Sequence, residues 1–289
     1  MKSFFQTIRN YLGNDLYSKI RFYGYKLLHG VYRPFSPDKF KQFLKEELEI
    51  KRSDTVFVHS SAQKLNINFS PHKVIEILQE VVGPEGTVAF PCWHFNYRAE
   101  EYLENRQNVF NVKKSPTVMG LLPELARRKK DSFRSLHPTS SVVAIGKNAE
   151  QLINHHHLSD YPCDRNSPFY RIMDYQGKII GLGEKPENSL SFIHCVEDEL
   201  KDSFPVKTRT DKIYEGRVMD WSGKEIKVKT RAAHKNIQRR DIKGFFKKYI
   251  KKEECRAFRK KGTWFFVADS EKLYAKLKNL GLKGKTVYY

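Results

Sequence analysis

Short apolar runs that alternate with helix-like stretches constrain the fold of this 289-residue chain more than any other feature. Each run is short enough for a buried strand and too short for a buried helix. The four runs are Val56–Val58, Val88–Phe90, Val142–Ile145 and Ile179–Leu182. The helices predicted between and after them lie near residues 71–82, 116–129, 147–155 and 189–200. This alternation indicates an α/β layered fold with a central sheet, parallel or mixed, flanked by helices.

Two further helices are predicted before the first strand. Residues 4–28 place an apolar residue at every third or fourth position, with basic residues largely off that stripe, which predicts an amphipathic helix. Such a helix either packs on its own domain or lies at an anionic membrane surface, and the pattern leaves both open. Ser36 as N-cap and Pro37 at the first helical position predict a helix that runs to Ile50.

The chain changes character after Pro205. Residues 213–218 and 225–230 flank Trp221-Ser222-Gly223 and predict a hairpin. A basic helix near 241–252, a strand at Trp264–Ala268 and a last helix capped by Ser270 follow. Because no linker or repeat interrupts the chain, we expect a helix over 1–35 and one unit over 36–289, with a core to 204 and a basic α+β extension over 205–289.

The net charge of +20 is concentrated at the two ends of the chain. Residues 1–35 contain six Lys or Arg and one acid, residues 201–289 contain 26 and 10, and the middle is nearly neutral. Basic ends attract phosphate-rich partners. No apolar run approaches the roughly 20 residues of a membrane-spanning helix, and the four cysteines form no CxxC pair. We therefore expect a cytoplasmic protein, with a position at the inner membrane left open.

His194 and Glu197 stand three residues apart on a predicted helix, so they share a face. A carboxylate there can fix the tautomer of the imidazole and stabilise its protonated form, as a general base requires. The same spacing is also common in purely structural pairs. The pair by itself therefore does not identify a reaction.

Two loops offer polar groups to a ligand. His59, Ser60 and Ser61 end the first predicted strand, and strand ends gather ligand-binding groups in α/β sheets. The stretch Ser115–Gly120 is predicted to open a helix, where a hydroxyl cap and free amides favour an anion. Ordinary helix capping explains both patterns equally well.

Taken together and in order, these stretches resemble the aminoglycoside 3-N-acetyltransferase family over roughly residues 38–200. The matching motifs are Val58-His59-Ser60-Ser61, Gly83-Pro84-Glu85-Gly86-Thr87, Ser115-Pro116-Thr117-Val118-Met119-Gly120, Arg134-Ser135-Leu136-His137-Pro138, Ser167-Pro168 and His194-x-x-Glu197. The resemblance implies an enzyme that transfers an acetyl group from acetyl-CoA to an amine of an amino sugar, without a metal.

The resemblance also implies roles for single residues. His194 is the expected base, with Glu197 beside it, and His59, in the coenzyme groove, is the third expected catalytic residue. The expected coenzyme-A-binding residues are Ser60, Ser61, Ser115, Thr117, Val118, Met119 and Gly120. Cys195 adjoins the base but is expected on another helix face, so it is not expected to carry the acyl group.

The acceptor is expected among aromatic and imidazole rings: Trp93 and His94 after the second strand, and His137 in a polar loop. Antibiotics of the aminoglycoside type are polycations, whereas this chain is strongly basic. We therefore expect an acceptor with phosphate or carboxylate, such as a nucleotide- or lipid-linked amino sugar of surface polysaccharide synthesis. An aminoglycoside acceptor, as in antibiotic resistance, is the alternative.

Two other classes of function remain open. A chain of this charge could be a basic binding protein for RNA or anionic membrane, although no RNA-binding motif is present and nucleic acid is the less favoured partner. His155-His156-His157 lacks acid or cysteine partners at metal-ligand spacing and is expected to be a helix end. The oligomeric state does not follow from the sequence.

Overall fold

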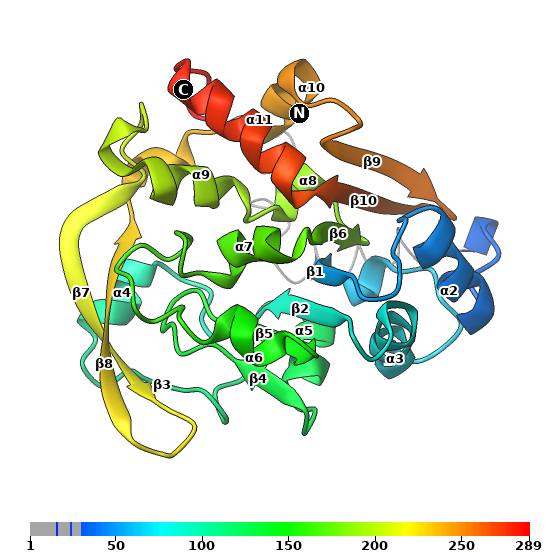
Figure 1. Ribbon diagram of the computed structural model, residues 1–289, viewed down its shortest axis with the longest axis horizontal. Helices are drawn as coiled ribbons and strands as arrows, with labels where there is room; N and C mark the ends of the chain where they lie inside the picture. Colours follow the sequence, from blue (N-terminus) through cyan, green and yellow to red (C-terminus); the bar gives the residue numbers. More distant parts are fainter. Residues whose placement is uncertain (1–15, 17–23, 25–29) are drawn as a thin grey trace.

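A seven-stranded mixed sheet forms the centre of the computed structural model, which describes residues 16, 24 and 30–289 (Figure 1). The strand order is β4-β5-β2-β1-β6-β10-β9. The bounds are β1 Thr55–Ser60, β2 Thr87–Pro91, β4 Ser132–Arg134, β5 Val142–Gly146, β6 Lys178–Leu182, β9 Cys255–Lys260 and β10 Thr263–Asp269. The α/β fold with a mixed sheet is therefore confirmed. The helix predicted over 4–28 lies almost entirely outside the described residues.

Three neighbouring strands of this sheet run parallel and bring their carboxyl ends together. β1 pairs in parallel with β2 on one side and with β6 on the other. The remaining pairs, β2 with β5, β4 with β5, β6 with β10 and β9 with β10, are antiparallel. Ligands of open α/β sheets bind beyond the carboxyl ends of parallel strands. Here those ends are Ser60, Pro91 and Leu182.

Helices cover both faces of the sheet (Figure 1). One layer contains α2 Pro37–Glu46, α3 Pro71–Val82 and α5 Leu121–Arg127. The other contains α6 Ala149–Ile153, α7 Pro168–Arg171, α9 Ile193–Leu200, α10 Ile242–Tyr249 and α11 Ser270–Leu282. Shorter helices are α4 Ala99–Glu104 and α8 Pro186–Ser189, and 3-10 turns are Ala62–Lys64, Ile172–Tyr175, Lys201–Ser203 and Lys235–Gln238.

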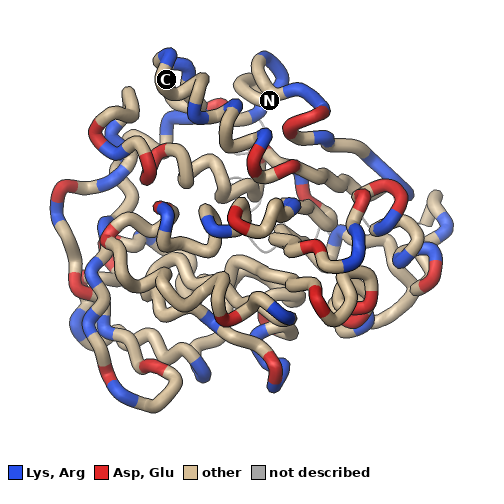
Figure 2. The backbone as a smooth tube through the Cα atoms, in the orientation of Figure 1, with Lys and Arg blue, Asp and Glu red and all other residues tan. Residues whose placement is uncertain are grey.

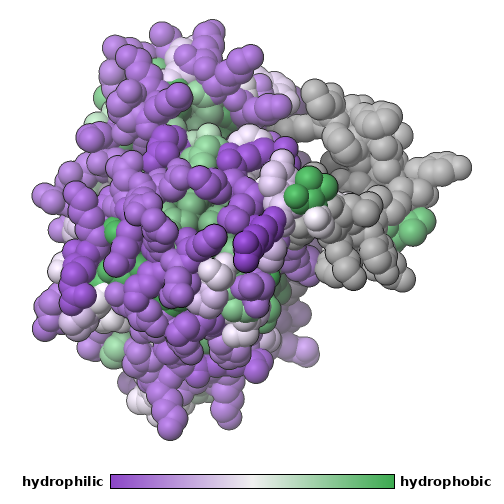
Figure 3. Space-filling view, turned by 90° about the vertical axis from the view of Figure 1, so that its right-hand side faces the viewer, coloured by the Kyte–Doolittle hydropathy of each residue, from purple (hydrophilic) through white to green (hydrophobic). Residues whose placement is uncertain are grey.

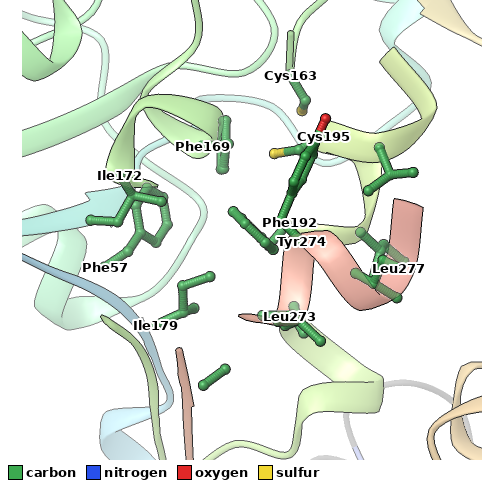
Figure 4. Close-up of a cluster of buried hydrophobic side chains, with 14 of the residues drawn as sticks. Phe57, Cys163, Phe169, Ile172, Ile179, Phe192, Cys195, Leu273, Tyr274 and Leu277 are labelled. Carbon is green, nitrogen blue, oxygen red and sulfur yellow. The ribbon is translucent and has the colours of Figure 1, made fainter. Parts of the chain in front are cut away.

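Each helix layer encloses its own apolar core, because neighbouring strand residues point to opposite faces. In β1, Val56 and Val58 pack with α2, α3 and α5, whereas Phe57 packs with α7, α9 and α11. Figure 4 shows Phe57 and Phe169 in this second core, which Leu273 and Leu277 of α11 also line. α9, which carries His194, packs against α11 and contributes Ile193, Cys195 and Val196 to this core.

The predicted hairpin is present and longer than the sequence pattern indicates. It consists of β7 Arg209–Met219 and β8 Glu225–Ala233, with a turn in which Gly223 has φ +88°. A third strand, β3 Val109–Asn111, pairs in parallel with β7 and was not predicted. This second sheet forms one side of the molecule (Figure 1).

Several predicted boundaries differ from the structure. The helix predicted near 116–129 begins only after Gly120. Residues 190–192 separate α8 from α9, so the helix predicted near 189–200 begins at Ile193. Asp269, whose side chain accepts a hydrogen bond from the Lys272 amide, caps α11 in place of Ser270. The edge strands β4 and β9 were not predicted either, because their residues are largely polar.

The surface is mainly hydrophilic on the face shown in Figure 3. Lys and Arg recur along the hairpin, α10 and the carboxyl terminus, with acids interspersed among them (Figure 2). Among the described helices, none combines the length and the apolar character needed to cross a membrane.

Candidate active site

Two cavities meet beyond the carboxyl ends of the parallel strands. The first cavity has a volume of about 780 Å³ and lies against the ends of β1, β2 and β6. The second cavity, of about 560 Å³, lies between the segment after β2 and the residues that follow the hairpin. Six residues line both cavities: Trp93, Val118, Met119, Ser191, His194 and Arg240. His194 thus stands where the contents of the two cavities would touch.

His194 and Glu197 form the pair that their spacing predicts. Both lie on α9, and His194 Nδ1 is 2.8 Å from Glu197 Oε2. Because a carboxylate can only accept, Nδ1 carries the hydrogen and the lone pair of the neutral ring lies on Nε2. The His194 side chain is 19% exposed and that of Glu197 2%. The arrangement is an oriented base with a buried carboxylate behind it.

Glu197 has a second partner, which lies at the other end of the chain. The hydroxyl of Tyr288 donates a hydrogen bond to Glu197 Oε1. Burial and the carboxylate together raise the pKa of Tyr288 well above its usual value, so the phenol remains a donor. Tyr288 is held in place by backbone pairing of the last residues with Arg239, Arg240 and Asp241. Both oxygens of Glu197 are therefore occupied.

His59, Ser60 and Ser61 line the first cavity, as expected from their place at the end of β1. Burial lowers the pKa of His59 to about 3, so its imidazole is neutral and a weak base. The Ser60 hydroxyl is buried without a hydrogen-bond partner among the described residues. An unpaired buried hydroxyl at a cavity wall is suited to a ligand amide or carbonyl.

The loop of residues 115–120 brings only its second half to the cavities. Val118, Met119 and Gly120 line the first cavity, whereas Ser115 and Thr117 line neither. The expectation that Ser115 caps a helix is wrong. Its hydroxyl accepts from the Asn111 amide, and Gly120, with φ +106°, precedes α5. Ser115 and Thr117 support the loop from behind.

Two side chains hold this loop in its non-helical path. Glu124 accepts a hydrogen bond from the Thr117 amide at 3.0 Å, and the Thr117 hydroxyl donates to the Trp93 carbonyl at 2.6 Å. The Arg134 guanidinium, buried and stacked on Phe110, donates to the carbonyls of Ser115 and Cys92. Arg134 therefore ties the loop to the residue after β2.

The three expected acceptor residues divide between the cavity wall and the interior. Trp93 lines both cavities, and its indole N–H is buried without an acceptor among the described residues. His94 instead stacks on Phe110 at 4.6 Å and lines neither cavity. His137 is buried against His156 at 4.5 Å, and its Nδ1 accepts from the Ser140 amide. The structure thus places His94 and His137 behind the site.

The four cysteines are buried and free. Burial raises the pKa of each thiol, most strongly for Cys163 and Cys195, and buried neutral thiols are poor nucleophiles. In the described part of the chain, no three His, Cys, Asp or Glu side chains are grouped as metal ligands. Both ring nitrogens of His156 are occupied, by the Ser135 hydroxyl and the Pro162 carbonyl.

Three residues of the site were not expected from the sequence. Ser191 and Arg240 line both cavities, and Tyr288 contacts Glu197. Arg240 belongs to a basic stretch that has no local feature to separate it from its neighbours. Tyr288 lies 91 positions from its partner, so only the fold brings the two together.

Comparison with known proteins decides the family. The family model for aminoglycoside 3-N-acetyltransferases matches residues 57–270, which is most of the chain. The chain belongs to the aminoglycoside 3-N-acetyltransferase family. The expected class of enzyme, an acetyl-CoA-dependent N-acetyltransferase, is thereby confirmed at the level of the family.

Curated relatives of this family are distant. The chain is 27% identical over 208 residues to the aminoglycoside N(3')-acetyltransferase-like protein YokD of Bacillus subtilis, a match that covers 65% of this chain and 76% of YokD. It is 27% identical to aminoglycoside N(3)-acetyltransferase VIII of Streptomyces fradiae, over 53% of this chain and 57% of that protein. The match to YokD therefore spans about three quarters of that protein, and the match to the Streptomyces enzyme less than two thirds.

Solved structures of family members share the fold. The aminoglycoside acetyltransferase AAC(3)-Xa superposes with a TM-score of 0.75 at 20% identity, covering 93% of this chain and 99% of that one. A binary complex of AAC-IIIb with coenzyme A gives a TM-score of 0.71 at 22% identity, over 87% of this chain and 97% of that one. At these identities the likeness shows the fold.

Proposed function

We propose that this chain transfers an acetyl group from acetyl-CoA to the amine of an amino sugar, with His194 as the general base. The observation that carries the proposal is the position of His194, oriented by Glu197 at the meeting point of two cavities. One cavity for each substrate allows the amine nitrogen to approach the thioester carbon directly. Transfer then needs no covalent acyl-enzyme.

The first cavity is the proposed site of acetyl-CoA. Its wall carries the buried, unpaired Ser60 hydroxyl, Ser61 and the loop residues Val118–Gly120. Gly120 has positive φ and presents no side chain toward the Ser60 carbonyl, which leaves the wall open there. A family member with a bound coenzyme A shares the fold, which supports the assignment. We keep Ser115 and Thr117 as supports of this wall.

The acceptor amine must lose two protons during the reaction, and the proposal assigns a destination to each. An ammonium group cannot attack a thioester, so the acceptor first loses one proton to solvent. Nε2 of His194 accepts the second proton as the nitrogen attacks the carbonyl carbon. The tetrahedral intermediate then expels the coenzyme A thiolate, which takes the proton from the imidazolium. The products are the acetamide and the free thiol.

The developing oxyanion needs hydrogen-bond donors, each typically worth about 3–4 kcal/mol. We propose the hydroxyl of Ser60 for this role, because it is buried at the cavity wall and has no other partner among the described residues. His59 is neutral at physiological pH because burial lowers its pKa to about 3. It is therefore proposed to orient groups near the thioester and not to remove a proton.

Two classes of acceptor are candidates. The names of the relatives favour an aminoglycoside, and they support this reading better than the narrower hypothesis of a nucleotide- or lipid-linked amino sugar. The charge of the chain favours an amino sugar that carries an anion. A binding protein for RNA or membrane has no support from the comparisons.

Release of the coenzyme A thiol from acetyl-CoA tests the proposal, with a panel of amino sugars and aminoglycosides as acceptors. Replacing His194 by Ala is expected to lower kcat by about 10²- to 10⁴-fold, because the attack loses its base. Binding of acetyl-CoA, measured by titration, should stay within about twofold. A variant that keeps wild-type kcat would remove His194 from the mechanism.

Substitution of Tyr288 by Phe tests whether the hydrogen bond to Glu197 helps to orient the base. Loss of one hydrogen bond to the buried Glu197 should lower kcat by roughly tenfold with little change in KM, because only the orientation of the base is affected. Tyr289 is 82% exposed and is the matched control. Equal effects of Tyr288→Phe and Tyr289→Phe would show that the Tyr288 hydroxyl does not assist the base.

A further inference from the structure

The second cavity has an unusual balance of charges. Five Lys or Arg side chains line it, against two carboxylates: Arg98, Arg209, Arg231, Lys235 and Arg240, with Glu100 and Glu197. His194 and His234 add two imidazoles. A cavity that binds polycations would be expected to show the opposite balance.

Both carboxylates of the cavity are already engaged. Glu100 accepts from Arg98 at 2.7 Å and from the Tyr214 hydroxyl at 3.0 Å. Glu197 holds His194 and Tyr288. An ammonium group of an acceptor would have to displace one of these partners to gain an ion pair.

The cations are not all engaged. Arg209 pairs with Asp198, and Arg231 pairs with Asp160. For Lys235 and Arg240, the described residues provide no carboxylate within 4.0 Å, the limit for an ion pair. Lys235 is exposed at the start of a 3-10 turn, and Arg240 is partly buried where the two cavities meet. Within residues 30–289, these two cations at the cavity therefore have no ion-pair partner.

The backbone of Arg240 is fixed next to the catalytic pair. Arg240 forms an antiparallel bridge with Tyr288, whose hydroxyl binds Glu197. Its position at the meeting point places its side chain close to the base, while Lys235 lines the second cavity only. An acceptor bound in the second cavity therefore has both cations in its wall, where each is suited to a charge-assisted hydrogen bond with an anionic group.

We propose that the second cavity binds an amino sugar that carries a phosphate or carboxylate, with Lys235 and Arg240 as the groups that contact the anion. This inference rests on the proposed function and names its acceptor class. The cavity discriminates against polycationic acceptors, because among its described lining residues they meet two cations without an ion pair and no carboxylate that lacks a partner.

The experiment compares four acceptors: glucosamine, a glucosamine phosphate, muramic acid as the carboxylate, and kanamycin. Wild type, Lys235→Gln and Arg240→Gln are assayed for thiol release. Arg239→Gln is the matched control, since Arg239 is exposed, adjacent to Arg240 and outside both cavities. Each cavity variant should raise KM for the preferred anionic acceptor by about tenfold, as expected for a charge-assisted hydrogen bond. The control should not change it.

The outcomes separate the proposals. A preference of wild type for the phosphate or the carboxylate, reduced in both cavity variants, supports the inference and identifies the anion. Higher kcat/KM for kanamycin than for both anionic acceptors overturns it and leaves the acetyltransferase intact. The inference is also overturned if Arg240→Gln changes only the KM for acetyl-CoA while Lys235→Gln has no effect. In that case Arg240 binds acetyl-CoA and not the acceptor. Failure of every amine to release thiol defeats the proposed function itself.

Discussion

Three buried histidines of this protein are neutral at physiological pH. Burial lowers the pKa of His59, His94 and His156 to about 3. The ring nitrogens of His94 make no hydrogen bond to the described residues, and the ring packs against Tyr102 and Phe110. Among the histidines that the structure describes, His194 alone combines a carboxylate partner with an opening to both cavities.

These histidines make the stability of the fold depend on pH. In the unfolded chain these histidines bind protons below about pH 6.5, whereas in the folded chain they stay neutral down to about pH 3. Their contribution to stability is therefore fully present above pH 6.5 and is lost as the pH falls below that value. Each group contributes about 1.4 kcal/mol per pH unit over that range. Urea unfolding at pH 7.5 and 5.5 should show a loss of about 4 kcal/mol from the three together.

Two variants check the origin of that slope. His94→Phe should make it shallower, since the ring already packs among aromatic side chains and gives up no hydrogen bond. His155→Asn, at an exposed position of the same histidine cluster as His156, should leave it unchanged. An unchanged slope in His94→Phe would assign the pH dependence to other groups.

Site residues could be identified from the sequence where their role depends on residues close to them along the chain. The spacing of His194 and Glu197 on one helix turn is local, and so is the position of Ser60 at a strand end. Tyr288 and Arg240 are paired across the fold and carry no local signal. His94 and His137 were expected at the acceptor because sequence pattern does not show which way a side chain points.

Among the elements, the segment of residues 115–120 departs most from its predicted form. Ser115 followed by Pro116 is a typical helix start. In the structure Glu124 takes the Thr117 amide, and Arg134 takes the Ser115 carbonyl. These long-range partners replace helical hydrogen bonds and turn Val118–Gly120 toward the cavities. Tertiary contacts here outweigh local propensity.

The turn after β6 is expected to be as important to the first cavity as the loop itself. Gly183 has φ +76°, and a Cβ there would lie 2.6 Å from the Ser61 carbonyl oxygen. Gly183→Ala should therefore displace the Ser60–Ser61 segment, lower stability by more than the roughly 1–2 kcal/mol of backbone strain, and raise KM for acetyl-CoA.

Gly284 provides a control with similar backbone strain but no steric contact for an added Cβ. Gly284 has φ +70° and open space around its Cβ position. Gly284→Ala should cost only the strain and leave KM unchanged. If the two variants are equally stable and equally active, the contact with Ser61 has no part in the cavity wall.

For the whole molecule, the basic extension contributes directly to the central sheet and to the site. β10 pairs with β6 and β9 pairs with β10, so residues beyond 205 complete the sheet whose strand ends form the first cavity. Residues of the segment 234–240 line the second cavity, and Tyr288 binds Glu197, the partner of the base. The division into 1–35 and 36–289 stays a proposal. The apolar runs predicted β1, β2, β5 and β6 in their order along the chain, whereas β3, β4, β9 and the order of strands in the sheet did not follow from the sequence.

The central claim is that both substrates meet at His194 and react directly. Initial rates measured over a grid of acetyl-CoA and acceptor concentrations test it. Direct transfer between substrates held in two adjoining cavities proceeds through a ternary complex, so the double-reciprocal lines should intersect. Parallel lines, the signature of an acetylated enzyme intermediate, would contradict the account.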